Sequence, residues 1–91
     1  MNYERTPQEI EQLQQQVQEM LDTYVRQEKF GFRLVVSPEY VQQEDWLHLE
    51  VMPDREGVRA YEYAEALMAV EKKLRREVNV EHVLLLPPLA A

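Results

Sequence analysis

The chain has 91 residues, the length of one domain, and its 10 Lys and Arg against 17 Asp and Glu give a net charge of −7. No stretch reaches the ~18 consecutive apolar residues of a membrane span, and a chain without cysteine forms no disulfide, thiolate nucleophile or iron–sulfur cluster. The first five residues lack the basic-then-apolar layout of a secretory signal. We therefore expect a single acidic domain over residues 1–91, located in the cytoplasm.

The first predicted element is a long amphipathic helix over residues 7–30. Thr6, Pro7 and Glu9 have the spacing of a capping box with proline in the first turn. Gly31 can close the other end in the left-handed conformation. Between these ends only Gln14 interrupts an apolar face that recurs every three or four positions, and this face comprises Ile10, Leu13, Val17, Met20, Leu21, Tyr24 and Val25.

Two strands are predicted next. Residues 32–36 alternate in character, and we expect this strand to end at Ser37-Pro38, because proline cannot donate to a strand ladder. Ser37, Pro38 and Glu39 can cap a single helical turn within a loop over residues 37–45. Residues 46–52 then alternate cleanly: Leu47, Leu49 and Val51 lie on one face, and Trp46, His48, Glu50 and Met52 on the other. The two strands are expected to pair antiparallel.

A second helix is predicted over residues 58–78, after turn residues at 53–57. Its acidic start and its basic end complement the helix dipole. Glu71 lies within its apolar arc, and we expect an ion pair with Arg75 one turn later. Residues 80–86 are predicted to form a last strand, which Pro87-Pro88 ends, and the apolar character of that strand indicates burial.

The order helix, strand, strand, helix, strand predicts an α+β fold. We expect a two-layer sandwich in which two long amphipathic helices cover one face of a three-stranded mixed sheet. The other face of the sheet then has no cover from this chain. The residues expected on that bare face are Trp46, His48, Glu50, Met52, Arg33 and Val35.

This bare face is the main indication of function. Trp46 is the only tryptophan, a residue that buries a large area with few rotors at interfaces, although it can also fold over the sheet edge against Tyr40 or Val41. A helix over residues 7–30 is about 36 Å long, whereas a strand over 46–52 spans about 23 Å, so an apolar end of the helix is expected to overhang. We predict a non-enzymatic interaction or assembly module, either a homodimer or a subunit of a larger assembly. The predicted interface residues are Trp46, His48, Met52, Arg33, Val35 and Tyr24.

Metal binding is one alternative. His48 and Glu50 lie two residues apart on one strand face, and His82 can join them if the last strand pairs alongside. The alternation of His82 with Leu84 and Leu86 allows it to face the helices instead. Zinc needs three or four such ligands, and no nucleophile or oxyanion donor accompanies these residues. We therefore expect no cofactor and no enzymatic activity.

Nucleic-acid binding is the second alternative, because the chain has one basic cluster, formed by Lys72, Lys73, Arg75 and Arg76. Together with aromatic stacking on the sheet, this cluster can contact phosphates, although a solvated helix end also explains it. The element order is loosely similar to that of K-homology domains that begin with a helix. Those domains grip nucleic acid with a GxxG loop, whereas residues 58–78 contain no glycine and the net charge is negative. The similarity covers topology only.

Overall fold

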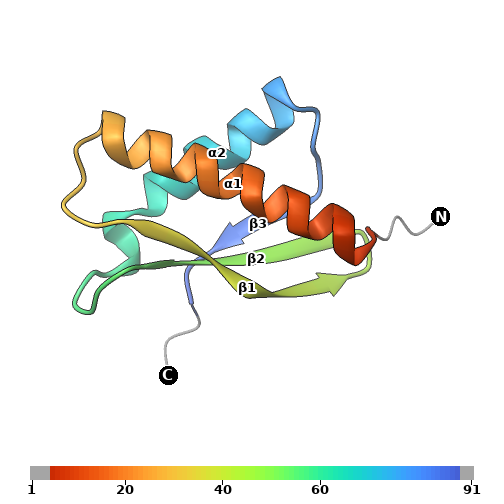
Figure 1. The fold of residues 1–91 in the computed structure, drawn as a ribbon, viewed down its shortest axis with the longest axis horizontal. Helices are drawn as coiled ribbons and strands as arrows, with labels where there is room; N and C mark the ends of the chain where they lie inside the picture. The colour runs from red at the N-terminus through yellow and green to blue at the C-terminus, as the bar shows by residue number, and fades with distance from the viewer. Residues whose placement is uncertain (1–4, 89–91) are drawn as a thin grey trace.

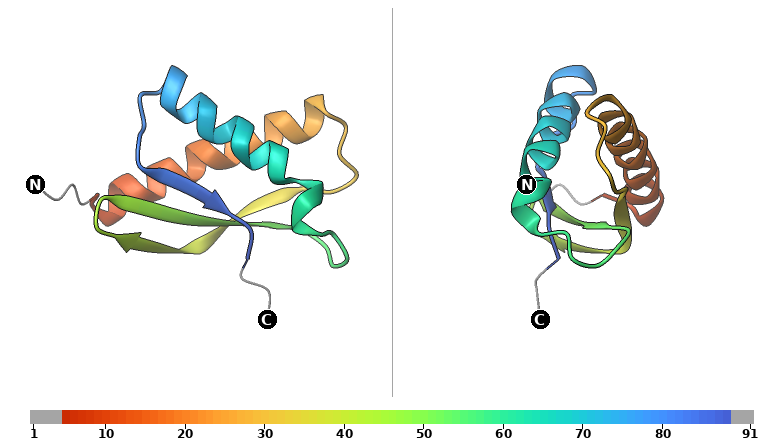
Figure 2. Two further views of the ribbon diagram at one scale, coloured as in Figure 1. Left: turned by 180° about the vertical axis from the view of Figure 1, so that it is seen from behind. Right: turned by 90° about the vertical axis from the view of Figure 1, so that its left-hand side faces the viewer.

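The computed structural model describes residues 5–88, and it confirms the α+β architecture (Figure 1). The elements are α1 (Pro7–Gln27), β1 (Leu34–Gln43), β2 (Trp46–Pro53), the short 3₁₀ helix η1 (Ala60–Glu62), α2 (Ala64–Glu77) and β3 (Val83–Leu86). The sheet has the order β1-β2-β3, with β1 antiparallel and β3 parallel to the central β2. Both helices lie on the same side of this sheet (Figure 2).

Helix α1 begins as predicted and ends earlier. The Glu9 N–H donates to Thr6 Oγ1 and the Thr6 N–H donates to Glu9 Oε1, each at 3.2 Å, so the capping box is present. The helix ends at Gln27 rather than at residue 30, and the residue in the left-handed conformation is Lys29, with φ 55°, not Gly31. The Phe30 N–H then donates to the Val25 carbonyl, which turns the chain back toward the sheet.

An aromatic cluster covers the end of α1 that the sequence suggested would overhang. The rings of Tyr24 and Phe30 lie 5.8 Å apart, those of Phe30 and Phe32 lie 5.1 Å apart, and Phe32 meets Tyr63 at 6.4 Å. Tyr24, Phe30 and Phe32 are all packed against the core. The apolar residues at this end of α1 are therefore partly buried within the chain itself.

Strand β1 continues through Pro38, so the predicted stop and the predicted helical turn at residues 37–39 are both wrong. The pairing register with β2 shifts between Val36 and Tyr40, which places Pro38 in an irregular segment of an outer strand. A missing N–H costs no ladder hydrogen bond at such a position. The connection to β2 is consequently only Glu44 and Asp45, and Glu44 takes a φ of 55°. The longer hairpin brings Tyr40 and Val41 beside the middle of β2.

The helix and the strand in the second half of the chain are shorter than predicted. The expected helix over 58–78 divides into η1 and α2, and the buried Tyr63 lies at the junction with φ −128° and ψ 12°. The Glu62 carboxylate accepts from the Arg59 N–H at 2.6 Å and closes the 3₁₀ turn. Strand β3 begins at Val83 rather than at residue 80, because Asn79 and His82 have left-handed φ values of 56° and 63° that interrupt an extended chain.

The core lies between the helix layer and the sheet. Leu47, Leu49 and Val51 of β2 are fully buried and face the helices, as their alternation predicts. Val83 and Leu85 of β3 are buried on the same side. The remaining fully buried aliphatic residues come from α1, β1 and α2, and they are Val17, Leu21, Leu34, Ala66, Val70 and Leu74. Every strand therefore directs one set of side chains toward the helices and leaves the alternate set on the far side of the sheet.

Candidate protein-interaction surface

The side of the sheet away from the helices carries no other layer of the described chain (Figure 2). We call it the open face and define it by the strand positions that alternate with the core, which are Val35, Val41, Gln43, Trp46, His48, Glu50, Met52, Leu84 and Leu86. The pairing register joins these residues into one surface, because Val41 is opposite His48 and His48 is opposite Leu84. Val41 is 56% exposed, and Trp46 and Leu86 are each 40% exposed.

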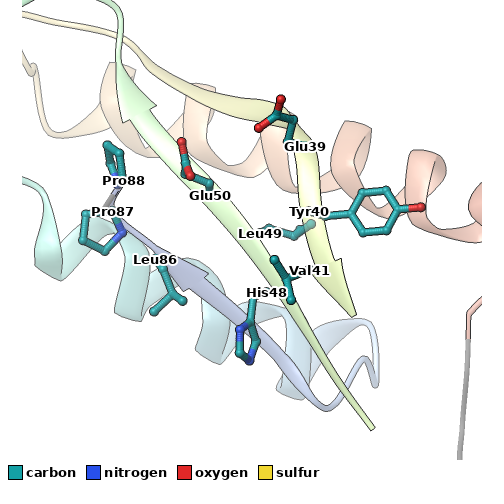
Figure 3. Close-up of a pocket in the computed structure, with 9 residues that line it drawn as sticks. All are labelled: Glu39, Tyr40, Val41, His48, Leu49, Glu50, Leu86, Pro87 and Pro88. Carbon is teal, nitrogen blue, oxygen red and sulfur yellow. The ribbon is translucent and has the colours of Figure 1, made fainter. Parts of the chain in front are cut away.

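A hollow of about 500 Å³ lies on this face. Most of its lining is apolar, and the lining residues are Glu39, Tyr40, Val41, His48, Leu49, Glu50, Leu86, Pro87 and Pro88. Figure 3 shows the carboxylates of Glu39 and Glu50 at one end of the hollow, with Val41 and His48 at the other. Glu39 is in this position only because β1 continues through Pro38, a feature that the sequence did not predict.

Trp46 lies beyond the Val41 end of the hollow and packs against His82. Their ring centroids are 5.0 Å apart, with the ring planes inclined at 45°. The aromatic partner of Trp46 is thus His82. This contact follows from the parallel pairing of β2 and β3, in which Leu47 is opposite Val83 and the Leu47 N–H donates to the His82 carbonyl at 2.9 Å. The tryptophan keeps 40% of its surface exposed despite this contact.

The three candidate metal ligands are not gathered into one site. Of the two orientations left open for His82, the structure shows the one away from the helices: His82 precedes β3 and its ring lies against Trp46, whereas Val83 and Leu85 are buried toward the helices. His82 nevertheless lies against Trp46, whereas His48 and Glu50 lie farther along β2. Within residues 5–88 no group of three or more His, Cys, Asp or Glu side chains is close enough to hold a metal ion.

Arg33 was expected on the open face, but its side chain is directed to α1. Its Nε lies 3.2 Å from Asp22 Oδ1, and its backbone N–H donates to Asp54 Oδ1 at 3.0 Å. The hydrogen bond and the negative charge of Asp22 raise the pKa of Arg33 above its ordinary value. The backbone N–H of Arg33, more than any other group, lowers the pKa of Asp54. Arg33 is the only basic residue predicted for the open face. Its ion pair with Asp22 of α1 keeps its side chain on the helix side of the sheet.

Side chains from both helices occupy hydrogen-bonding groups at the two outer edges of the sheet. At β1, Gln18 Oε1 accepts from the Val36 N–H and Gln18 Nε2 donates to the Leu34 carbonyl, both at 2.8 Å. Gln14 Nε2 adds a bond to the Ser37 carbonyl at 3.2 Å, which explains the polar residue in the apolar face of α1. These backbone groups are therefore unavailable to a strand added at this edge.

At the β3 edge, the side chain of Glu71 occupies a backbone hydrogen-bonding group. Its Oε1 accepts from the Leu85 N–H at 2.8 Å, so the expected ion pair with Arg75 is replaced by a bond to the sheet. Glu71 is half-buried on the side of α2 that faces β3, whereas Arg75 is exposed to solvent. Sequence reasoning identified the unusual position of Glu71 but not the partner.

The basic cluster on α2 does not share a surface with the open face. Lys72, Lys73, Arg75 and Arg76 are all exposed on a helix that covers the opposite side of the sheet (Figure 1). The nucleic-acid alternative combines this cluster with aromatic stacking on the sheet, and the structure places the cluster on the helix side and Trp46 on the open face. The nucleic-acid alternative stays a prediction, now with its two parts on different sides of the sheet.

No protein-family model, curated protein or solved structure matches this chain. Among the described helices, none has both the length and the apolar character needed to cross a membrane. The function is therefore inferred from the geometry of the open face.

Proposed function

We propose that the protein is a non-enzymatic interaction module that binds another polypeptide through the open face of its sheet. The observation that carries this proposal is the hollow of about 500 Å³ with its apolar lining, beside the exposed Val41, Trp46 and Leu86. Apolar surface gains about 25 cal/mol per Å² when it is removed from water. A contiguous apolar area of this kind on a small domain is typical of a contact surface.

The occupied edges favour contact on the face over strand addition. Gln14 and Gln18 occupy backbone groups of β1 between Leu34 and Ser37, and Glu71 occupies the Leu85 N–H of β3. A partner that paired with either of these edge segments would have to displace those side chains first. The homodimer expected from the sequence is one form of this proposal, and it stays a prediction.

Selection from a displayed library of random peptides tests the proposal. We expect the selected peptides to bind the wild-type protein, to shift the emission of Trp46 to shorter wavelength and to lose affinity for Val41→Asp. Met68→Asp is the matched control, because Met68 is 61% exposed on α2, on the other side of the sheet. Failure to select any peptide, or equal loss of affinity with both variants, would count against the open face as the binding surface.

A further inference from the structure

We infer that the open face selects a segment that carries lysine or arginine next to apolar side chains, in preference to a second copy of this chain. This inference rests on the proposed function and adds the chemistry of the partner. It is carried by the charges of the face, by their separation from the apolar end of the hollow and by the position of the chain's own basic residues.

The charge of the open face has one sign. Glu39 of β1 and Glu50 of β2 both line the hollow, and their carboxylates lie at the same end of it (Figure 3). The strand positions that define the open face contain no lysine or arginine, and Arg33 is engaged with Asp22 on the other side. Among residues 5–88, neither carboxylate is in an ion pair. Two carboxylates at one end of the hollow without a counter-charge favour a cationic group, and an ammonium or a guanidinium supplies the charge and the hydrogen-bond donors.

The apolar part of the surface is at a defined distance from this charge. Trp46 and Glu50 are four residues apart on β2, which corresponds to about 13 Å at 3.3 Å per residue. Val41 and Leu84 lie between them, each opposite His48, and Leu86 is opposite Glu50. A helix of about nine residues covers that length at 1.5 Å per residue. A matching segment therefore has a basic residue at one end and apolar residues over the following two turns.

A second copy fits this surface poorly. A symmetric dimer through the open face would use the same patch on both subunits, so Glu39 and Glu50 of each copy would enter one interface that contains no basic side chain. Like charges brought together in this way disfavour the wrong partner. The chain's own cluster, Lys72 to Arg76, lies on α2 on the opposite side and is unavailable to a symmetric contact of this kind.

The test uses the full chain and three synthetic peptides of about 14 residues, long enough to cover the surface as a helix. The first is an amphipathic helix of Leu and Lys, the second has Glu in place of Lys, and the third is a scrambled Leu/Lys sequence without an apolar face. Affinity is measured from the emission of Trp46, because none of the peptides contains tryptophan. We expect binding of the first peptide, and at least about tenfold weaker binding of the other two, since each lacks one of the two complementary features.

Two double variants locate the charge effect. Glu39→Gln with Glu50→Gln is expected to weaken binding of the Leu/Lys peptide by about tenfold. Glu11→Gln with Glu19→Gln changes the net charge equally at exposed positions of α1, and we expect less than about a twofold effect, because the salt-screened charge of the whole chain adds little. Circular dichroism of both double variants checks that each retains the fold.

The alternative outcomes separate this inference from the proposed function. Equal binding of the Leu/Glu peptide, or an equal loss with both double variants, would overturn the basic partner and leave the open face as the contact surface. A dimer in light scattering at micromolar concentration, dissociated by Val41→Asp and unaffected by the Leu/Lys peptide, would assign the face to a second copy. Loss of every face-dependent interaction would instead overturn the proposed function itself.

Discussion

The two sides of strand β2 have the same backbone and different chemistry. Leu47, Leu49 and Val51 point toward the helices and are fully buried among aliphatic side chains. The alternate side carries Trp46, His48, Glu50 and Met52, which lie in a surface that also includes Leu84 and Leu86 of β3. A sheet face that only met water would be mainly polar. The open face is instead a mixture of apolar and acidic groups, and its exposed apolar groups support the proposal of a contact surface.

The distinction between the two sides depends on how the helices are attached. Burial of the apolar faces of α1 and α2 provides most of the attachment. Hydrogen bonds from Gln18 and Glu71 to the outer strands add to it, and they fix each helix to one edge of the sheet. The covered side is consequently built for stability, whereas substitutions on the open side should change binding with little effect on folding.

The largest expected effect compares Leu49 with Leu86. Leu49→Ala removes a fully buried side chain and should lower the free energy of unfolding by about 2–5 kcal/mol through lost burial and the cavity that remains. Leu86→Ala makes the same chemical change at a residue that is 40% exposed, and it should cost about 1 kcal/mol or less. Urea denaturation followed by circular dichroism measures both. Similar losses for the two variants would remove the distinction between the sides.

An intermediate effect is expected at the β1 edge. Gln18→Ala removes both the acceptor of the Val36 N–H and the donor to the Leu34 carbonyl, so the free energy of unfolding should fall by about 1–2 kcal/mol. Gln15→Ala is the control, since Gln15 is exposed on the same helix and takes part in no hydrogen bond found within the described residues. Hydrogen exchange of the Val36 amide should accelerate in the first variant alone. An unchanged exchange rate would contradict the role assigned to Gln18.

Sequence predicts this fold where the signal is local or strictly periodic. The capping box at Thr6 to Glu9 is local, and the alternation of residues 46–52 fixes which side of β2 is buried. The passage of β1 through Pro38 is not predictable in this way, because a register shift depends on the pairing strand. Residues 83–86 are apolar at every position, so alternation gives no phase, and the orientation of Leu84 and Leu86 toward the open face follows only from pairing with β2.

The candidate site shows the same division. Trp46, His48, Glu50 and Met52 were placed on the open face by alternation alone, whereas Glu39 was missed because it reaches the hollow through the irregular part of β1. Arg33 occupied an outward position in the pattern, but a long side chain at an outer strand can reach either side, and Asp22 of α1 decides which. Gln18 and Glu71 bond to backbone groups far away in sequence, and side-chain type gives no signal of such partners.

The smallest expected effect on stability concerns Asp54, whose side chain accepts a hydrogen bond from the Arg33 backbone N–H at the end of the hairpin. The Arg33 N–H lowers the pKa of Asp54 below its usual 3.8. Stability from this ionised group is therefore fully present above the unfolded-state pKa, and it is lost as the pH falls through the lower folded-state pKa. Asp54→Asn keeps an acceptor oxygen but cannot titrate, so its deficit in melting temperature relative to wild type should shrink below about pH 5. Glu56→Gln changes an exposed residue in the same turn, and its melting temperature relative to wild type should show no such convergence. A constant difference in melting temperature between wild type and Asp54→Asn, from pH 7 down to the acid transition, would contradict the assigned hydrogen bond.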